Sequence, residues 1–280
     1  MALVLALLSA AFYGTADFLG GVAARRAPAL AATVAAQGCG LVVVLLAMPL
    51  FASGAPSTSG VLWGVAAGLA GGVGVALLYY GFAVGRVSVV APVTGVCSIS
   101  IPVVIALILG ERPGSLALAG ILIAIASVAL ISRQEDSAGT SPQRDRSIAI
   151  AIASGLAIGA FFVCLARAGG VAAGLWPLVI ARAASTVLLA GVATLAKVPL
   201  RIPRAALGPA VACGAIDVLA NALYVVAVRD GPLGIVATLA SLYPASTVLL
   251  ARLVLRERLR PVQSLGLAGA TIAIVMITRR

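Results

Sequence analysis

The second half of this 280-residue chain repeats the first half after a shift of 146 residues. The seven residues beginning at Gly85 align with those beginning at Gly231, and the six beginning at Leu107 align with those beginning at Leu253. A unit duplicated over this length predicts two halves that share one internal arrangement and pack against each other.

The solvent that these two halves require is lipid. Hydrophobic residues make up 62% of the chain, charged residues only 10%, and the mean hydropathy is +1.18, whereas a soluble domain carries about 25% charged residues. A spanning helix needs about 20 mainly apolar residues, so we expect an all-α membrane protein with ten transmembrane helices. The ten apolar segments are 3–23, 29–51, 61–83, 87–109, 115–132, 148–168, 174–196, 206–228, 232–254 and 261–278.

The most polar stretch of the chain separates the fifth apolar segment from the sixth. We expect residues 1–132 to form the first five-helix repeat, residues 133–147 a polar linker, and residues 148–280 the second repeat. Because five is an odd number, the second repeat enters the membrane upside down, which makes the repeats inverted. The first apolar segment lacks the flanks of a cleaved signal peptide, so we expect it to stay as a helix.

Several function classes conflict with the sequence. The net charge of +11 does not indicate a nucleic-acid partner, because most basic residues lie at helix ends and in short loops, as membrane anchors do. Histidine and the motifs HExxH, GxSxG and Walker A do not occur, so we do not expect an enzyme. We expect no metal and no cofactor, because the cysteines lie in apolar stretches without metal-binding spacing: Cys39, Cys97, Cys164 and Cys213.

One succession of motifs occurs in both halves. The first half carries Val-Val-Ala-Pro from Val89, Leu-Gly-Glu-Arg from Leu109 and then Gly120, and the second half repeats this pattern with Glu257 and Gly266. The pattern resembles the EamA-like branch of the drug/metabolite transporter superfamily, and the resemblance covers nearly the whole chain. It implies that each five-helix repeat is an EamA-like repeat.

The beginnings of the two halves agree as well, with the register shifted by one residue. Ser9–Gly14 parallels Ser154–Gly159. The second half departs from the pattern at Thr238 and Arg256, where the first half has proline and glycine. The resemblance therefore implies one shared fold whose two halves are chemically unequal.

The resemblance implies a multi-pass protein of a bacterial inner membrane that exports or imports small metabolites, often amino acids or related compounds. It also implies cytoplasmic chain ends, whereas the positive-inside rule favours external ends. That rule is applied here to two groups of basic residues. The side away from the ends collects Arg25, Arg26, Arg86, Arg133, Arg144, Arg146, Lys197, Arg201, Arg204, Arg256, Arg258 and Arg260, and the other side collects Arg112, Arg167, Arg229, Arg279 and Arg280.

Glu111 and Glu257 each stand beside an arginine in a short turn between two apolar segments. We interpret them, together with Gly120 and Gly266, as a structural motif. Each carboxylate would accept hydrogen bonds from free N–H groups at the start of the next helix, or pair with a neighbouring arginine. A contact that gates the transport path is the alternative.

Polar side chains inside apolar segments indicate a central binding site. An ionisable group at mid-depth costs roughly 2.5–3.5 kcal/mol, so it normally faces a cavity or a partner. Asp217, Asn221 and Tyr224 share one helical face of the eighth segment, and Asp17 lies four residues after Tyr13 on one face of the first segment. These five residues are candidates for binding a substrate.

Arg182 lies well inside the seventh apolar segment, with no local route to water. Either Asp17 or Asp217 can neutralise it as an ion pair, which leaves the other acid to take up a proton or to hold a cationic group of a solute. A purely structural pair without a role in transport is the alternative.

Three more residues complete the candidate substrate-binding set. Tyr79 continues a glycine-rich face of the third segment, Ser98 lies in the fourth, and Tyr243 lies in the ninth. Prolines inside the fourth and ninth segments remove backbone hydrogen bonds, so they indicate either bending points or static kinks: Pro92, Pro102 and Pro244.

Together these features predict a secondary transporter, and more specifically an exporter, of small polar metabolites such as amino acids. It would work by alternating access around a site at mid-membrane. The expected partners are membrane lipid, the metabolite and protons, with no nucleic acid. The alternatives are a non-transporting subunit of a membrane lipid-handling complex and a membrane-embedded enzyme.

Overall fold

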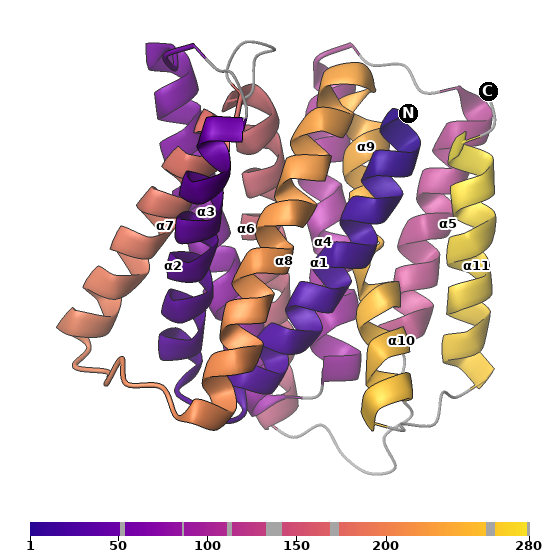
Figure 1. Cartoon of the computed structure of the whole chain (residues 1–280). Helices are drawn as coiled ribbons and strands as arrows, with labels where there is room; N and C mark the ends of the chain where they lie inside the picture. The colour runs from indigo at the N-terminus through magenta and orange to yellow at the C-terminus, as the bar shows by residue number, and fades with distance from the viewer. Residues whose placement is uncertain are drawn as a thin grey trace.

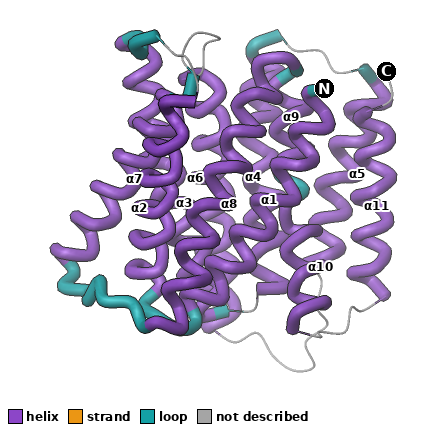
Figure 2. The backbone as a smooth tube through the Cα atoms, viewed as in Figure 1, coloured by secondary structure: helices purple, strands orange, loops and turns teal. Residues whose placement is uncertain are grey.

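The computed structural model describes residues 1–50, 54–85, 87–110, 114–132, 142–168, 174–255 and 261–278. Within these ranges every regular element is a helix and no strand occurs, as Figure 2 shows. The helices stand side by side in one bundle, and α1 begins at the same end of the bundle at which α11 ends (Figure 1). The expectation of an all-α protein is confirmed.

The helices follow the apolar segments of the sequence. In the first half they are α1 (Ala2–Ala24), α2 (Ala29–Ala47), the short 3₁₀ helix η1 (Met48–Leu50), α3 (Thr58–Val84), α4 (Val87–Ile108) and α5 (Ser115–Ser132). In the second half they are α6 (Pro142–Ala168), α7 (Trp176–Leu195), α8 (Arg204–Asp230), α9 (Leu233–Ala240), α10 (Tyr243–Leu255) and α11 (Pro261–Thr278). The first turns of α6 thus lie within the range 133–147 that we expected to be a linker.

Lipid accounts for the outer surface of this bundle. Among the described residues, seven helical segments are long and apolar enough to span a membrane, and two further apolar helices are shorter. Large apolar side chains face outward, with Leu62 66% exposed, Val187 72% and Leu253 66%. In hydrocarbon a helix satisfies its own backbone N–H and C=O groups, which explains why every described element takes this form.

Helix starts are set by local chemistry. The Ser57 side chain caps α3 by accepting a hydrogen bond from the N–H of Gly60 at 3.0 Å. Pro28, Pro203 and Pro232 stand directly before α2, α8 and α9. Because proline has no N–H and a fixed φ, it weakens the continuation of a preceding helical turn and is well tolerated where a new helix begins.

Equivalent helices of the two halves run in opposite directions. In Figure 1, α2 rises from the lower end of the bundle to the upper end, whereas its counterpart α7 descends. In the same view α3 descends and its counterpart α8 rises. This antiparallel arrangement is the geometry expected of an inverted repeat.

Hydrogen bonds between the helices repeat with the same spacing as the sequence. The Ser9 hydroxyl of α1 donates to the carbonyl oxygen of Ala220 in α8 at 2.8 Å. The Ser154 hydroxyl of α6 donates to the carbonyl oxygen of Gly74 in α3, also at 2.8 Å. Gly74 and Ala220 are separated by the 146-residue shift, and the two serines carry the one-residue slip found at the start of each half. The α1–α8 interface is therefore reproduced as the α6–α3 interface.

Glycines at equivalent positions let the helices of the two halves approach closely. A Cβ on Gly214 of α8 would overlap the carbonyl oxygen of Ala36 in α2, and a Cβ on Gly68 of α3 would overlap the carbonyl oxygen of Ala181 in α7. Small residues at such crossings allow backbone-to-backbone contact in membrane proteins. Gly68 belongs to the glycine-rich face of the third segment, and the close approach that it allows occurs in both halves.

The last helices of the two halves, α5 and α11, pack against each other at one edge of the bundle (Figure 1). Gly120 and Gly266 are buried on these helices. Glu111 and Glu257 lie outside the described residues, so their structural role stays a prediction.

The fourth helix differs between the halves. α4 runs as one helix through Pro92 and Pro102, whereas the corresponding span of the second half is interrupted at Ser241 and Leu242 and continues as α10. Pro244 lies in the first turn of α10, where a missing N–H leaves no intrahelical bond broken. The second half therefore carries a discontinuous helix next to the interior of the bundle.

Candidate functional site

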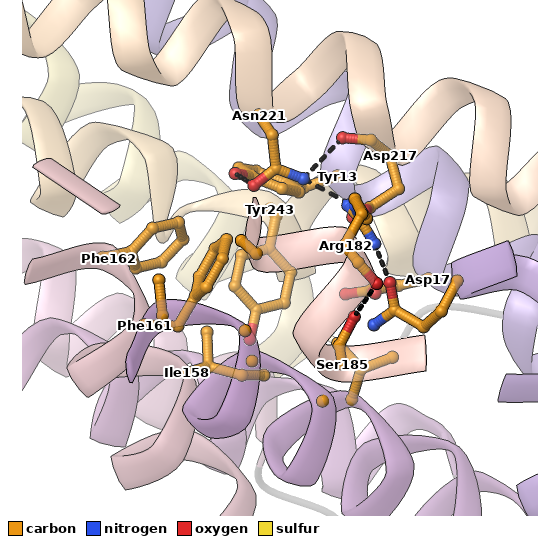
Figure 3. Close-up of a pocket in the computed structure, with 17 residues that line it drawn as sticks. Tyr13, Asp17, Ile158, Phe161, Phe162, Arg182, Ser185, Asp217, Asn221 and Tyr243 are labelled. Carbon is orange, nitrogen blue, oxygen red and sulfur yellow. Dashed lines mark hydrogen bonds and ion pairs between the residues drawn. The ribbon is translucent and has the colours of Figure 1, made fainter. Parts of the chain in front are cut away.

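A cavity lies between the two repeats and receives side chains from α1, α2, α3, α6, α7, α8 and α10. One part of its wall is polar, with Tyr13, Asp17, Gln37, Arg182, Ser185, Asp217, Asn221 and Tyr243. The remaining wall is apolar, with Ala67, Gly68, Gly71, Gly72, Val75, Ile158, Phe161, Phe162 and Ala181. Figure 3 shows Ile158, Phe161 and Phe162 on one side of the cavity and Asp17, Arg182 and Asp217 on the other.

The centre of the polar wall is an ion pair between Arg182 of α7 and Asp217 of α8. The Arg182 side chain is 10% exposed and that of Asp217 is 17% exposed. A second nitrogen of the guanidinium donates a hydrogen bond to the side-chain oxygen of Gln37 in α2. The sequence left two possible partners for Arg182, Asp17 and Asp217, and the structure pairs it with Asp217.

Asn221 extends this network from α8 to α1. Its amide nitrogen donates to the Asp217 carboxylate at 3.0 Å and to the Asp217 carbonyl oxygen at 2.7 Å. Its amide oxygen accepts a hydrogen bond from the Tyr13 hydroxyl at 2.8 Å. A continuous chain of polar contacts thus joins α2, α7, α8 and α1 across one side of the cavity, and dashed lines in Figure 3 mark part of it.

Asp17 is the acid that remains without such a partner. It lies one helical turn after Tyr13 on α1, is 8% exposed and lines the cavity. Among the described residues its carboxylate makes no hydrogen bond and no ion pair. A buried carboxylate in this position is available to a proton or to a cationic group of a bound molecule.

Aromatic rings form the boundary between the polar and apolar walls. The Tyr13 ring meets Phe162 edge-on at a centroid distance of 5.6 Å and Tyr243 at 6.4 Å. Phe161 and Phe162 are neighbours on α6 with ring centroids 5.6 Å apart. The Tyr243 hydroxyl is buried and, within the described part of the chain, has no hydrogen-bond partner. These rings offer the cavity a flat apolar surface close to its charged groups.

Three of the predicted site residues lie outside the cavity lining. The Tyr224 hydroxyl donates to the carbonyl oxygen of Phe162 at 3.0 Å, the Tyr79 hydroxyl contacts the Cys213 sulfur at 2.9 Å, and the Ser98 hydroxyl donates to the carbonyl oxygen of Gly95 at 2.9 Å. Their polar atoms are thus engaged within the helix packing. The other six, which line the cavity, are Tyr13, Asp17, Arg182, Asp217, Asn221 and Tyr243.

One wall is polar and the other apolar because equivalent positions of the two repeats carry different side chains. Four polar lining residues have apolar or side-chain-free counterparts, and these line the opposite wall: Tyr13 corresponds to Ile158, Asp17 to Phe162, Asp217 to Gly71 and Asn221 to Val75. A symmetric framework thereby encloses an asymmetric, amphipathic space.

Sequence reasoning missed several residues of this cavity. Gln37 had a detectable signal, because it is an amide in an apolar segment. It is also the counterpart of Arg182 when the one-residue slip at the start of each half is taken into account. Ser185 lies one turn from Arg182 and donates to the carbonyl oxygen of that residue at 3.0 Å. Phe161 and Phe162 had no signal, since two phenylalanines in an apolar helix are ordinary lipid-facing or core residues.

No group of three or more potential metal ligands occurs among the residues that the structure covers. The four cysteines are free thiols, and only Cys213 is fully buried. The chemistry of the cavity is therefore that of one guanidinium, two carboxylates, amides, hydroxyls and aromatic rings.

An all-helical, multi-pass membrane protein whose two repeats enclose a partly polar cavity falls in the class of membrane transporters. The family model of the EamA-like transporter family matches residues 1–133 and matches again over residues 146–279. The chain therefore belongs to the EamA-like transporter family, as the repeated motifs predicted. Members of this family are transporters and not enzymes.

A solved crystal structure supports the same fold. It is similar over 99% of this chain and 98% of its own, with a TM-score of 0.78 and 16% sequence identity. At this identity the likeness concerns the fold alone. Among curated proteins, no match to this chain is found.

Proposed function

We propose that the protein is a secondary transporter with ten spans in the inner membrane, and that it exports small metabolites with a zwitterionic head, such as amino acids. The observation that carries this proposal is the central cavity between the repeats, in which the Arg182–Asp217 pair and Asp17 stand opposite an aromatic wall. A pocket with few polar groups among apolar ones fixes the orientation of a small ligand.

Each end of such a solute finds a complementary group. A solute carboxylate binds to Arg182, whose planar guanidinium pairs with carboxylates in a two-pronged geometry. A solute ammonium binds to Asp17, which lacks a protein partner in the described structure. An apolar side chain packs on Phe161 and Phe162 across the cavity.

The inverted repeats support alternating access around this site. The polar network joins α1 and α2 of the first half to α7 and α8 of the second, so a solute that competes for Arg182 also perturbs the contact between the halves. Asp17 is the proposed coupling group, since it can exchange a proton for the solute ammonium. The interruption between α9 and α10 is a place beside the cavity at which this span can bend.

Counterflow in proteoliposomes tests the proposal. Vesicles loaded with an unlabelled apolar amino acid should accumulate the labelled form, and vesicles without protein should not. Product formation without flux would favour a membrane-embedded enzyme. If the pure protein gives neither flux nor product, but flux appears with an added membrane fraction, the protein is a subunit of a larger complex.

The aromatic wall should decide which side chains are accepted. Phe161→Ala is expected to raise the half-saturating concentration of an apolar amino acid about tenfold, since burial of an apolar side chain contributes roughly 1.5–3 kcal/mol. The value for glycine, which has no side chain to pack, should stay within about twofold. Trp63→Ala, an aromatic truncation on the outer face where Trp63 is 38% exposed, is the matched control. An equal loss for both amino acids would contradict the assignment.

A further inference from the structure

A second pocket adjoins the central cavity and reaches the turn between α1 and α2. It is lined by the last turns of α1, by the two arginines that follow this helix and by the start of α4: Asp17, Phe18, Gly21, Val22, Arg25, Arg26 and Val87. Asp17 lines this pocket and the central cavity as well. The two spaces are therefore neighbours with one carboxylate between them.

The spacing of residues on α1 explains why the two spaces line up. Tyr13, Asp17, Gly21 and Arg25 follow one another at intervals of four residues, which places them on one face of the helix. Tyr13 lines the central cavity and Arg25 lines the second pocket. At Gly21, which lines the second pocket, the ring of Phe82 packs close to the backbone. One helix face thus leads from the central site to the end of α1.

Two guanidinium groups stand at the outer end of this path. Arg25 and Arg26 are both exposed. Arg26 donates to the carbonyl oxygen of Ala205 at 3.0 Å, which holds it at this position without neutralising its charge. The path is thus cationic at its mouth and anionic at its inner end, where Asp17 stands.

We infer that the second pocket is a vestibule through which solutes pass between the α1–α2 end of the protein and the central cavity, and that it selects zwitterions. Arg25 and Arg26 attract the solute carboxylate, and Asp17 favours passage of a solute that also carries an ammonium group. A purely cationic solute is repelled at the mouth and a purely anionic one at Asp17. The inference rests on the proposed function, because it names the route and the charge type of the same solute.

Charge-selective labelling tests the mouth of the vestibule. In Val22→Cys, an anionic methanethiosulfonate should react about tenfold faster than a cationic one, after each rate is divided by the rate of the same reagent with a free thiol. The reason is that a cleft lined by positive charge raises the local concentration of anions. Arg25→Gln combined with Arg26→Gln should remove this preference. Leu8→Cys, on the same helix where Leu8 is 45% exposed to lipid, should react no faster than the native cysteines. An unreactive thiol in Val22→Cys, or a preference that survives the double arginine change, would overturn the inference.

The same labelling distinguishes a solute from a lipid headgroup. The preference for the anionic reagent should be equal in vesicles of neutral lipid and in vesicles that contain anionic lipid. If anionic lipid removes it, the two arginines hold lipid phosphates and the vestibule role is wrong.

A reporter in the central cavity tests whether the path is continuous. The thiol of Ser185→Cys should react with reagent added on the side from which the thiol of Val22→Cys is reached. Val22→Phe should slow the reaction of the Ser185→Cys thiol at least about fivefold, because the larger side chain fills the vestibule. Val87→Phe, at another residue that lines this pocket, is a second filling variant should Val22→Phe not fold. Gly191→Leu, at a glycine with open space around it, should leave the rate unchanged.

Unslowed labelling of the Ser185→Cys thiol in a folded filling variant would refute the path. Labelling needs no transported solute, so this result and the counterflow result can fail independently.

Discussion

Asp217→Asn is expected to abolish counterflow and to destabilise the folded protein by about 3 kcal/mol, because it leaves the buried Arg182 guanidinium without a carboxylate. Removal of one partner of a buried ion pair typically costs about 3–5 kcal/mol. The contact of Arg182 with Gln37 persists in this variant, but an amide oxygen does not neutralise a charge. Thermal unfolding in detergent and counterflow in proteoliposomes measure the two effects.

Paired substitutions separate folding from transport. Asp217→Asn combined with Arg182→Gln removes both charges and keeps hydrogen-bonding groups, so it should recover most of the lost stability while transport stays absent. Asp17→Asn combined with Arg182→Gln is the matched control and should recover nothing relative to Arg182→Gln alone, since Asp17 makes no contact with that guanidinium. Equal recovery by both acids would mean that the pair forms differently in the membrane.

Much of the fold was predictable because the repeat and the hydropathy act over the whole chain. Long apolar segments must become helices in lipid, and the shift of 146 residues returned as matching contacts of Ser9 and Ser154. The interruption at Ser241 was indicated only by Pro244, because α4 remains one helix through Pro92 and Pro102. Proline alone therefore does not determine whether a span breaks.

The candidate site was predictable only where an ionisable group had to find a partner. The sequence placed Arg182 between two possible acids, and the choice of Asp217 required the packing of α7 beside α8. Tyr224 shares the helical face of Asp217, but seven residues along a helix correspond to roughly 10 Å, which carries its hydroxyl beyond the cavity to the backbone of Phe162. Helical periodicity gives the direction of a side chain and not its depth.

Gly214→Ala is expected to destabilise the protein by about 1–3 kcal/mol, the usual cost of adding atoms to a packed interior. The new methyl group would overlap the backbone carbonyl of Ala36, which cannot turn aside as a flexible side chain can. The helices α2 and α8 would have to separate, and the Arg182 network that bridges them to α7 would be strained. Thermal unfolding in detergent measures the loss.

The inverted repeat makes this a paired prediction. Gly68→Ala places a methyl group against the carbonyl of Ala181 at the equivalent crossing of α3 and α7, so the two losses should agree within about 1 kcal/mol and should add in the double variant, as changes at separate sites do. Gly191→Ala, in α7 with nothing near the new methyl group, should instead be neutral or gain up to about 1 kcal/mol from helix propensity. If only one of the two crossings is sensitive, the halves do not pack in the same way at equivalent positions. A mechanism in which the two halves exchange equivalent conformations would then lose its structural basis.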